Sequence, residues 1–337
     1  MTVVITGGCG FIGTNFVRNW LLSMNEKLIN VDKLSYAAVQ ETAKIINTNY
    51  EFVKLDINQT EKIKSLFWEH KPRAVIHFAA ESHVDRSIDK PSNFVETNVA
   101  GTFSLLEASK DYFSQLDDRQ KSLFKFINIS TDEVYGSLQK NDLPFTEQSS
   151  IDPSSPYSAS KASSDLISRS YYKTYGLPVI ISRCSNNFGK YQHQEKFIPT
   201  IINSIASGKE IPIYGDGNQV RDWIYVADHV EALMTLLQQA KPGSIYNIGG
   251  DKELENINLA RLICGIMAER EMKDPSYYDD LIVSVTDRLG HDFRYAINYQ
   301  KINCDWGWRP KHQFNDALSR TIEWYLAKKT KANEMDQ

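Results

Sequence analysis

The sequence has few cysteines, and those it has lie far apart. Cys9, Cys184, Cys264 and Cys304 form no C-x-x-C pair, which argues against both a disulfide framework and a structural zinc site. Reduced thiols are typical of cytosolic proteins, so we expect a cytoplasmic protein that holds no metal.

The sequence also lacks a long apolar run and an excess of charge of either sign. No run of about 18 apolar residues occurs, and no basic segment followed by an apolar stretch opens the chain, so we expect neither a membrane span nor a signal peptide. The 38 Lys and Arg residues nearly balance 42 Asp and Glu residues, which leaves nucleic-acid binding without an electrostatic source. We therefore expect a small-molecule partner, no nucleic acid and no membrane.

What the sequence does contain is an alternation of short apolar segments with helix-length segments. Apolar segments typical of buried strands occur at residues 3–6, 28–31, 52–55, 74–78, 124–129 and 179–182. Helical patterns occur at residues 14–24, 60–70, 92–113 and 158–175. Because strands that are apolar on both faces and separated by helices form right-handed crossovers, the fold class is predicted to be α/β, with a Rossmann-type doubly wound parallel sheet.

After residue 183 this alternation becomes irregular. Turn-rich pieces mix with short strands and with amphipathic stretches at residues 259–269 and 314–327, which predicts a smaller interleaved α/β lobe. The expected division is a Rossmann domain at residues 1–183 with 222–250 returning to it, a second lobe at 184–221 and 251–327, and a frayed tail at 328–337.

A glycine-rich loop follows the first predicted strand. Gly7, Gly10 and Gly13 satisfy G-x-x-G-x-x-G at the junction between that strand and a helix, where a dinucleotide's pyrophosphate can approach the backbone. Asp32 ends the next strand, where its carboxylate can bind a ribose 2′-hydroxyl. Asp32 repels a 2′-phosphate, which favours NAD over NADP, although Lys33 weakens that preference. The alternative is a plain glycine turn with a surface aspartate.

Tyr157 and Lys161 stand four residues apart at the start of a predicted helix, and hence on one face of it. A nearby ammonium is expected to lower the phenol's pKa and make tyrosinate a base for alcohol oxidation. Most Y-x-x-x-K pairs are solvated helical pairs. The glycine loop and Thr131, which ends the fifth predicted strand, favour the catalytic interpretation.

Several runs resemble the extended short-chain dehydrogenase/reductases and, within them, the dTDP-glucose 4,6-dehydratase family, from Val3 to about Leu326. The matching runs are TGGCGFIG, VDKLSYA, HFAAESHVDRSI, ETNVAGT, ISTDEVYGS, PSSPYSASKASSD, RCSNNFG, PIYGDG, RDWIYV and DRLGHDFRYAI. The acid pair Asp132-Glu133 distinguishes this family from related epimerases. Without that context, two neighbouring acids would be read as an exposed loop pair.

The resemblance implies a hydro-lyase that converts dTDP-D-glucose to the 4-keto-6-deoxy sugar for deoxysugar synthesis, such as that of rhamnose, with NAD tightly bound. By resemblance Tyr157 is the base at C4, Lys161 its partner, and Thr131 binds the C4 oxygen. A C4 ketone acidifies the C5–H bond, so Glu133 can remove that proton while Asp132 protonates the departing C6 hydroxyl. One carboxyl must be charged and the other protonated, which requires environments that split their pKa values.

The resemblance also implies two sets of binding residues. The NAD contacts are Gly7, Gly10, Phe11, Ile12, Gly13, Asp32, Lys33, Leu34, Ser35, Asp56, Ile57, Phe78, Ala79, Ala80, Ser82, Thr97, Tyr157, Lys161 and Asn187. The nucleotide-sugar contacts are Ser82, Thr131, Asn186, Lys196, Phe197, Pro212, Ile213, Tyr214, Arg221, Asn256, Arg288 and His291. The arginines suit a diphosphate because guanidinium groups bind phosphate oxygens bidentately.

Alternatives remain at this stage. His77, Glu81, His83 and Asp85 could be read as a metal site, but their spacing follows a strand and its loop, and hydride chemistry needs no metal. UDP-glucose dehydration, 4-epimerisation and a nucleotide-binding regulator without turnover are the competing functions. The helices at 92–113 and 158–175 resemble the family's dimer contact, so a homodimer is expected.

Overall fold

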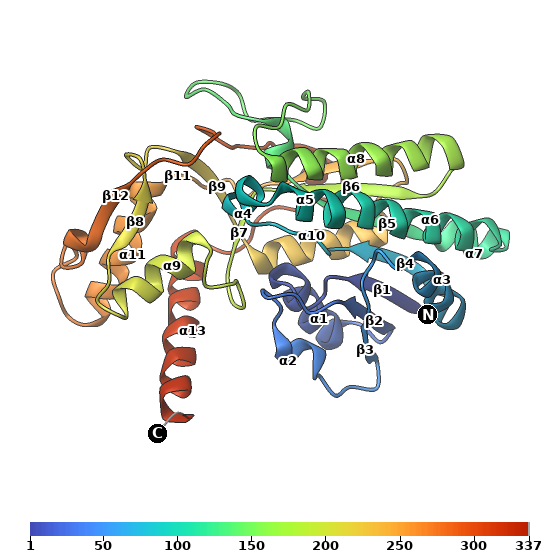
Figure 1. Ribbon diagram of the computed structural model, residues 1–337, viewed down its shortest axis with the longest axis horizontal. Helices are drawn as coiled ribbons and strands as arrows, with labels where there is room; N and C mark the ends of the chain where they lie inside the picture. Colours follow the sequence, from blue (N-terminus) through green and yellow to red (C-terminus); the bar gives the residue numbers. More distant parts are fainter. Residues whose placement is uncertain (336–337) are drawn as a thin grey trace.

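The computed structural model describes the backbone of residues 1–335 and the side chains of residues 1–330. Within that range the chain forms a seven-stranded sheet in the order β10-β6-β5-β4-β1-β2-β3 (Figure 1), and every neighbouring pair is parallel. The strands are β1 (Thr2–Thr6), β2 (Lys27–Asp32), β3 (Tyr50–Lys54), β4 (Pro72–His77), β5 (Lys125–Thr131), β6 (Val179–Cys184) and β10 (Ile245–Ile248). The predicted doubly wound parallel sheet is confirmed.

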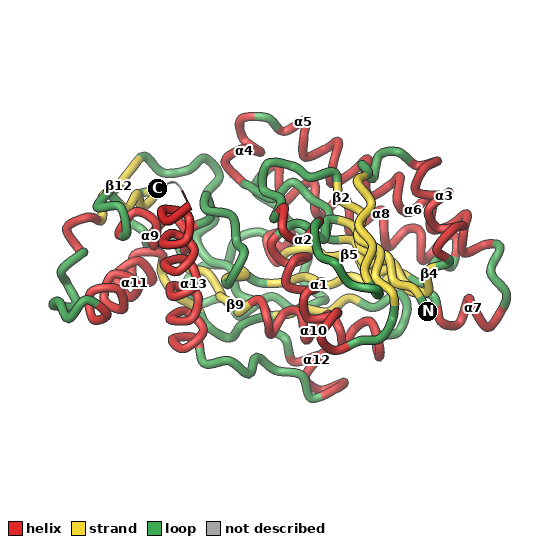
Figure 2. Tube along the Cα trace, turned by 90° about the horizontal axis from the view of Figure 1, so that it is seen from below, coloured by secondary structure: helices red, strands yellow, loops and turns green. Residues whose placement is uncertain are grey.

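Helices cover both faces of this sheet, as the two apolar faces of its strands require. On one face lie α1 (Phe11–Ser23), α10 (Val226–Gln239) and α12 (Gln300–Trp306), which bury Trp20 and Leu233 against Val3 and Ile5. On the other lie α3 (Thr60–His70), α6 (Gly101–Ser114) and α8 (Pro156–Tyr175), whose core includes Phe67. Figure 2 shows the two layers on opposite sides of the twisted strands.

Shorter elements connect the main layers of this part of the chain. They are α2 (Gln40–Ala43), α4 (Val84–Asp89), α5 (Pro91–Phe94), the π-helix η1 (Val95–Ala100), α7 (Asp118–Leu123) and the 3₁₀ helix η2 (Asp132–Tyr135). The helix expected at residues 92–113 is therefore interrupted by η1, because a π turn inserts an extra residue that propensity does not signal.

A smaller lobe lies at the carboxyl edge of the main sheet, on the left in Figure 1. Its sheets pair β7 (Asn186–Phe188), β9 (Val220–Tyr225) and β11 (Glu253–Glu255), and, separately, β8 (Ile211–Tyr214) with β12 (Ile282–Val285). Its helices are α9 (Phe197–Ile205), α11 (Asn256–Arg270), η3 (Asp279–Leu281) and α13 (Phe314–Met335). These helices enclose a separate apolar core around Ile202, Ile263 and Leu318.

Two segments bear on the expected division of the chain. After β9 in the small lobe, α10 and β10 pack with the main sheet, where β10 pairs with β6. At the carboxyl end, α13 continues to Met335 through most of the tail expected to fray at 328–337, and residues 336–337 lie outside the described part. No helix among the described residues is long and apolar enough to cross a membrane.

Candidate active site

A cavity of about 300 Å³ opens at the carboxyl ends of β1, β2, β4 and β5, between the main sheet and the small lobe. Parallel sheets place ligands at this edge. Most of the predicted cofactor set lines it: Gly7, Gly10, Phe11, Ile12, Gly13, Asp32, Lys33, Ser35, Asp56, Ile57, Phe78, Ala79, Ala80, Ser82, Thr97, Tyr157, Lys161 and Asn187. Leu34 lies beside the cavity and is not part of the described lining.

The glycine loop leaves room for a ligand because side chains cannot fit there. Gly7 has φ +71°, and a Cβ on it would lie 2.4 Å from the Ala79 nitrogen. A Cβ on Gly13 would lie 2.4 Å from the Gly7 carbonyl oxygen, so this residue lets α1 pack against the loop. No side chain of the described residues caps α1 after Gly10, and its first N–H groups therefore remain available to phosphate oxygens.

Asp32 is fixed at the end of β2 by the backbone around it. Its carboxylate accepts hydrogen bonds from the Cys9 N–H at 2.9 Å and the Leu34 N–H at 2.8 Å. Burial raises the pKa of Asp32, although these bonds and the charge of Lys33 oppose that shift. The Lys33 ammonium lies 3.8 Å from Asp56 and 3.4 Å from the Thr97 hydroxyl. This pocket, with its glycine cradle and acid, fits NAD.

The loop after β4 is held by Asn98 of η1. The Asn98 side chain accepts from the Glu81 N–H and donates to the Glu81 carbonyl, both at 2.9 Å, and donates to the Ser160 hydroxyl at 2.8 Å. The π turn therefore aligns the loop with α8.

His77, which the sequence offered as a candidate metal ligand, forms hydrogen bonds through both ring nitrogens, with the hydroxyls of Thr6 at 2.7 Å and Thr102 at 3.0 Å.

Thr131, Asp132 and Glu133 turn into the cavity at the end of β5. The Glu133 N–H donates to the Thr131 hydroxyl, which donates to the Asp132 carboxyl, each at 3.3 Å. Asp132 is 2% exposed, and its other carboxyl oxygen has no hydrogen-bond partner among the described residues. Asp132 is thus buried and Glu133 half-buried in the cavity wall, which excludes the exposed-loop interpretation.

The two acids differ in electrostatic surroundings. Burial, together with the charges of Glu133 and Asp222, raises the pKa of Asp132 well above its ordinary value. Burial also raises the pKa of Glu133, but the cations Arg221 and Lys196 oppose that shift. Since adjacent carboxylates ionise in turn, the proton resides preferentially on Asp132.

Tyr157 and Lys161 share one face of α8, whose start is fixed by Pro156 and a capping box between Ser155 and Ser158. The expectation that Lys161 lowers the phenol's pKa is wrong for this arrangement. Burial and the charge of Glu133 raise the pKa of Tyr157 well above its ordinary value.

The reason lies in the direction of the Lys161 side chain. Its ammonium donates to the Ile129 carbonyl at 2.7 Å, and no hydrogen bond joins it to Tyr157 in the described part of the chain. Burial lowers the pKa of Lys161.

The predicted substrate set is divided. Ser82, Thr131, Asn186 and Lys196 line the cavity. The remainder lie outside its described lining: Phe197, Pro212, Ile213, Tyr214, Arg221, Asn256, Arg288 and His291.

Several members of the outer group are engaged with other residues of the protein. Arg288 donates to Asp85 from Nε at 2.6 Å and Nη2 at 3.0 Å, and the Tyr214 hydroxyl donates to Asp85 at 3.2 Å. His291 lies 2.7 Å from Asp287.

The sequence analysis missed a further part of the cavity wall. It comprises Val31, Tyr36, Ala37, Ala38, Leu55, Glu81, Ile129, Ser130, Cys184, Ser185, Gln192, His193 and Glu195. Those next to predicted contacts could have been found by extending each motif by one or two residues. Glu195 stands next to the predicted contact Lys196 and could have been found in the same way. Gln192 and His193 carry no local signal, because only tertiary packing brings them to the cavity.

Comparisons with known proteins agree with this geometry. Residues 4–321 match the family described as GDP-mannose 4,6 dehydratase. The chain is 46% identical over 331 residues to a dTDP-glucose 4,6-dehydratase of Haemophilus influenzae, covering 97% of this chain and 98% of the relative.

Two solved structures are similar over nearly the whole chain. The dTDP-glucose 4,6-dehydratase of Streptomyces venezuelae with NAD and TYD bound has a TM-score of 0.88 and 39% identity, covering 98% of each chain. That of Bacillus anthracis in complex with NAD has a TM-score of 0.86 and 41% identity, also covering 98% of each.

Proposed function

The chain belongs to the GDP-mannose 4,6 dehydratase family, and from that premise we propose that it catalyses the NAD-dependent dehydration of dTDP-glucose to the 4-keto-6-deoxy sugar. The relatives similar over 97% or more of this chain are named dTDP-glucose 4,6-dehydratases. The observation that carries the proposal is the pair of buried Asp132 and half-buried Glu133 beside Tyr157 in one cavity. Neither UDP-glucose dehydration, epimerisation nor a regulator without turnover is favoured by these relatives.

NAD is the cofactor, and the residues that would hold it are those of the glycine loop, Asp32 and the loop after β4. When bound, NAD supplies the hydride acceptor for oxidation at C4 and, once reduced, the hydride donor to C6. The uncapped start of α1 suits its pyrophosphate, and Asp32 suits the adenosine ribose.

In the first step Tyr157, as tyrosinate, removes the C4 hydroxyl proton, and Thr131 holds the C4 oxygen. Because the pKa of Tyr157 is raised, little tyrosinate is present without a nearby cation. A cation close to the phenol, which bound oxidised NAD would supply, would favour tyrosinate. Lys161, tied to the Ile129 carbonyl, adds a buried positive charge on the same helix face.

In the second step the C4 ketone acidifies the C5–H bond, and Glu133 takes that proton. Asp132 gives its proton to the C6 oxygen, so the C6–O bond breaks and water leaves as the C5–C6 double bond forms. The surroundings of the two carboxyls support this assignment, because the charges of Glu133 and Asp222 favour the protonated form of Asp132, whereas Arg221 and Lys196 favour the charged form of Glu133. A hydride delivered to C6 and a proton delivered to C5 would complete the 6-deoxy sugar, and bound NAD would supply that hydride.

The nucleotide diphosphate is proposed to bind on the small-lobe side, near Arg221 and Arg288. Both guanidinium groups influence the pKa of Glu133, which supports their closeness to the reacting centre. Arg221 is buried and donates to backbone carbonyls of Val220 and Asp292 at 2.8 and 3.0 Å. It therefore serves as a fixed charge, while Arg288 binds Asp85 through Nε and Nη2 and makes no hydrogen bond from Nη1 to any residue that the structure describes.

The direct test is to incubate the protein with dTDP-glucose and, separately, with UDP-glucose, and to identify products by NMR. We expect the 4-keto-6-deoxy product, with one solvent deuterium at C5, to form faster from dTDP-glucose. An epimerised sugar without loss of water, or no conversion of either substrate, would refute the proposal.

We also propose a homodimer formed through α6 and α8. Phe103 is 50% exposed and Leu166 54% exposed on these helices, an apolar face that suits a second copy of the chain. Sedimentation is the test: Phe103→Glu with Leu166→Glu should give monomers. Leu143→Glu, at an 85% exposed loop position, should leave the assembly unchanged, and a dimer that survives both changes would exclude this face.

A cytoplasmic location is proposed as well. All four cysteines are free, and three of them, Cys9, Cys184 and Cys264, are buried. Free thiols are stable in a reducing compartment. Fractionation of the host cell, with detection of the native protein, tests this location.

A further inference from the structure

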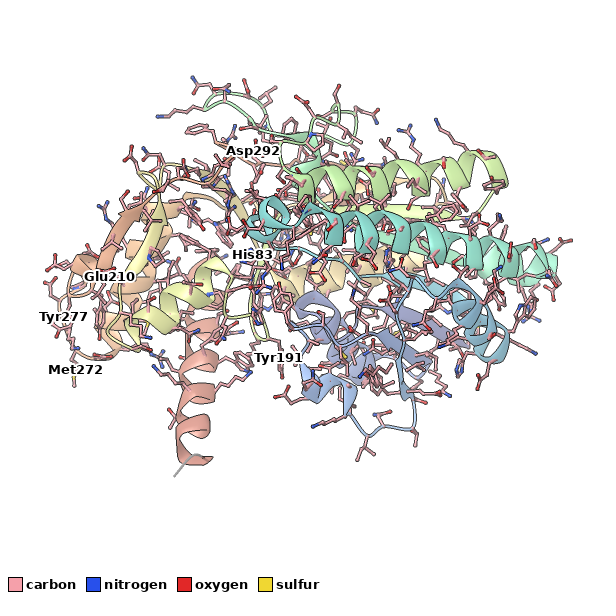
Figure 3. The ribbon with its side chains drawn as sticks, in the orientation of Figure 1. His83, Tyr191, Glu210, Met272, Tyr277 and Asp292 are labelled. Carbon is pink, nitrogen blue, oxygen red and sulfur yellow. The ribbon has the colours of Figure 1, made fainter. Side chains whose placement is uncertain are left out.

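The segment Lys190–Lys196, here called the strap, joins β7 to α9. It belongs by sequence to the small lobe, yet Gln192, His193, Glu195 and Lys196 line the NAD cavity together with residues of the main sheet. Figure 3 shows His83 and Tyr191 at the junction between the two parts of the molecule. The strap thus brings residues of the small lobe into the wall of the cavity whose residues would hold NAD.

Glu195 fastens the strap at two points of the NAD domain. One carboxylate oxygen accepts the Tyr36 hydroxyl at 2.7 Å, and the other accepts Arg86 Nη2 at 3.0 Å. Tyr36 follows β2 and Arg86 lies in α4, so Glu195 ties the strap to two separate segments of the NAD domain. The Arg86 guanidinium also lies over the Tyr36 ring at 3.8 Å, which closes a three-residue contact that we call the clasp.

The surroundings keep Glu195 charged. Burial raises its pKa, but the Tyr36 hydrogen bond and the nearby His83, His193 and Arg86 hold that pKa below its ordinary value. His193 Nδ1 is 3.4 Å and His83 Nε2 3.9 Å from the carboxylate. Hydrogen bonds to a charged group are stronger than neutral ones, so the charge of Glu195 strengthens both hydrogen bonds of the clasp.

The ends of the strap are tied down independently. At one end the Asn15 side chain donates to the Lys190 carbonyl at 3.0 Å, and the Tyr325 hydroxyl donates to the Gln192 carbonyl. At the other end the Lys196 ammonium donates to the Ser82 carbonyl at 2.7 Å. Between these ties, Glu195 holds the strap to Tyr36 and Arg86.

We propose that Glu195 is a positioning residue that locks the strap over NAD, so that the cofactor stays bound while it is reduced during turnover. The inference rests on the proposed function, since the reaction returns the same hydride to the sugar and loss of reduced NAD would leave the 4-keto hexose without dehydration. The clasp slows NAD exchange; it takes no part in proton transfer.

The experiment measures NAD release from the purified protein by chasing bound NAD with labelled NAD. Glu195→Gln should release NAD about tenfold faster, because one charge-assisted hydrogen bond of this kind is lost. Glu26→Gln is the matched control: Glu26 binds Arg73 at 2.6 Å and is 21% exposed, against 18% for Glu195. Glu26→Gln should lower the melting temperature about as much as Glu195→Gln does, without changing the rate of NAD release.

Tyr36→Phe provides a second variant should Glu195→Gln fold poorly, because it removes one hydroxyl and keeps the ring beneath Arg86. It should also speed release, by a smaller factor. A second readout is the fraction of turnovers that end as free 4-keto hexose, which should rise in both variants.

NAD release as slow as in the unaltered protein, in both variants, would overturn the proposal. If the unaltered protein did not convert dTDP-glucose, the proposed function would be refuted instead. The measurement of NAD release would still decide whether Glu195 holds the strap over NAD.

Discussion

The NAD-facing half of the site and the nucleotide-sugar half are built differently. The NAD-facing half is formed at the ends of neighbouring parallel strands, and nearly all of its predicted residues line one cavity. The second is gathered from β8, β9, α11 and the loop after β12, and its charged groups are already paired within the protein, as Arg288 is with Asp85.

The difference shows how each half depends on the fold. Strand order alone brings the glycine loop, Asp32 and Thr131 to one edge of the sheet. Arg221 and Arg288 reach the reacting centre only if the small lobe packs in one particular way. The acid pair lies where the two halves meet. Glu133 follows directly after β5, and Arg221 and Lys196, which come from the small lobe, favour its charged form.

The largest expected effect is at this meeting point. Glu133→Gln should lower kcat by about 10³-fold, because it removes the base that takes the C5 proton. NAD should remain bound, since Glu133 holds no part of the glycine cradle. Measurement of C5–H exchange into deuterated solvent checks the role, and exchange at the normal rate in this variant would exclude Glu133 as the base.

Asp132→Asn should slow water loss by about 100-fold while still permitting oxidation at C4. Since burial and neighbouring charges raise the pKa of Asp132, its acid form survives to higher pH than that of an exposed aspartate. The activity of the unaltered enzyme should therefore fall as pH rises through that raised pKa. The variant should lack this fall, and an identical pH profile in both proteins would contradict the assignment.

Gly13→Ala tests the cofactor half alone. The new Cβ would lie 2.4 Å from the Gly7 carbonyl and 2.7 Å from Gly8 Cα, so the backbone must shift, at about 2 kcal/mol of overpacking. Thermal unfolding and NAD titration should both show the loss. Gly265→Ala on α11 is the control, because its nearest neighbours are at 3.8 Å; equal effects would discredit the close-packing argument.

Arg288→Gln tests the substrate half and should have the smallest effect. Loss of one charged contact to a partly exposed diphosphate should raise KM about tenfold with little change in kcat. Arg270→Gln, which breaks a surface pair with Glu323 at 2.8 Å, should leave KM unchanged. A drop in kcat alone would move Arg288 from substrate binding to the chemical step.

The sequence predicted the features that local pattern controls. The sheet, the glycine loop and the strand-end acids follow from periodicity and motifs. The direction of the Lys161 side chain, the π turn at η1 and the strap do not, because each depends on contacts between segments distant in sequence. The phenol's pKa was misjudged for the same reason: burial of Tyr157 outweighs a lysine whose ammonium is bound to the Ile129 carbonyl.

Infrared spectroscopy of the carboxyl groups at neutral pH tests the central claim most directly. The account predicts the C=O stretch of a protonated carboxyl that disappears in Asp132→Asn and persists in Glu133→Gln. A band that persists in Asp132→Asn and disappears in Glu133→Gln would reverse the acid and the base and contradict the mechanism.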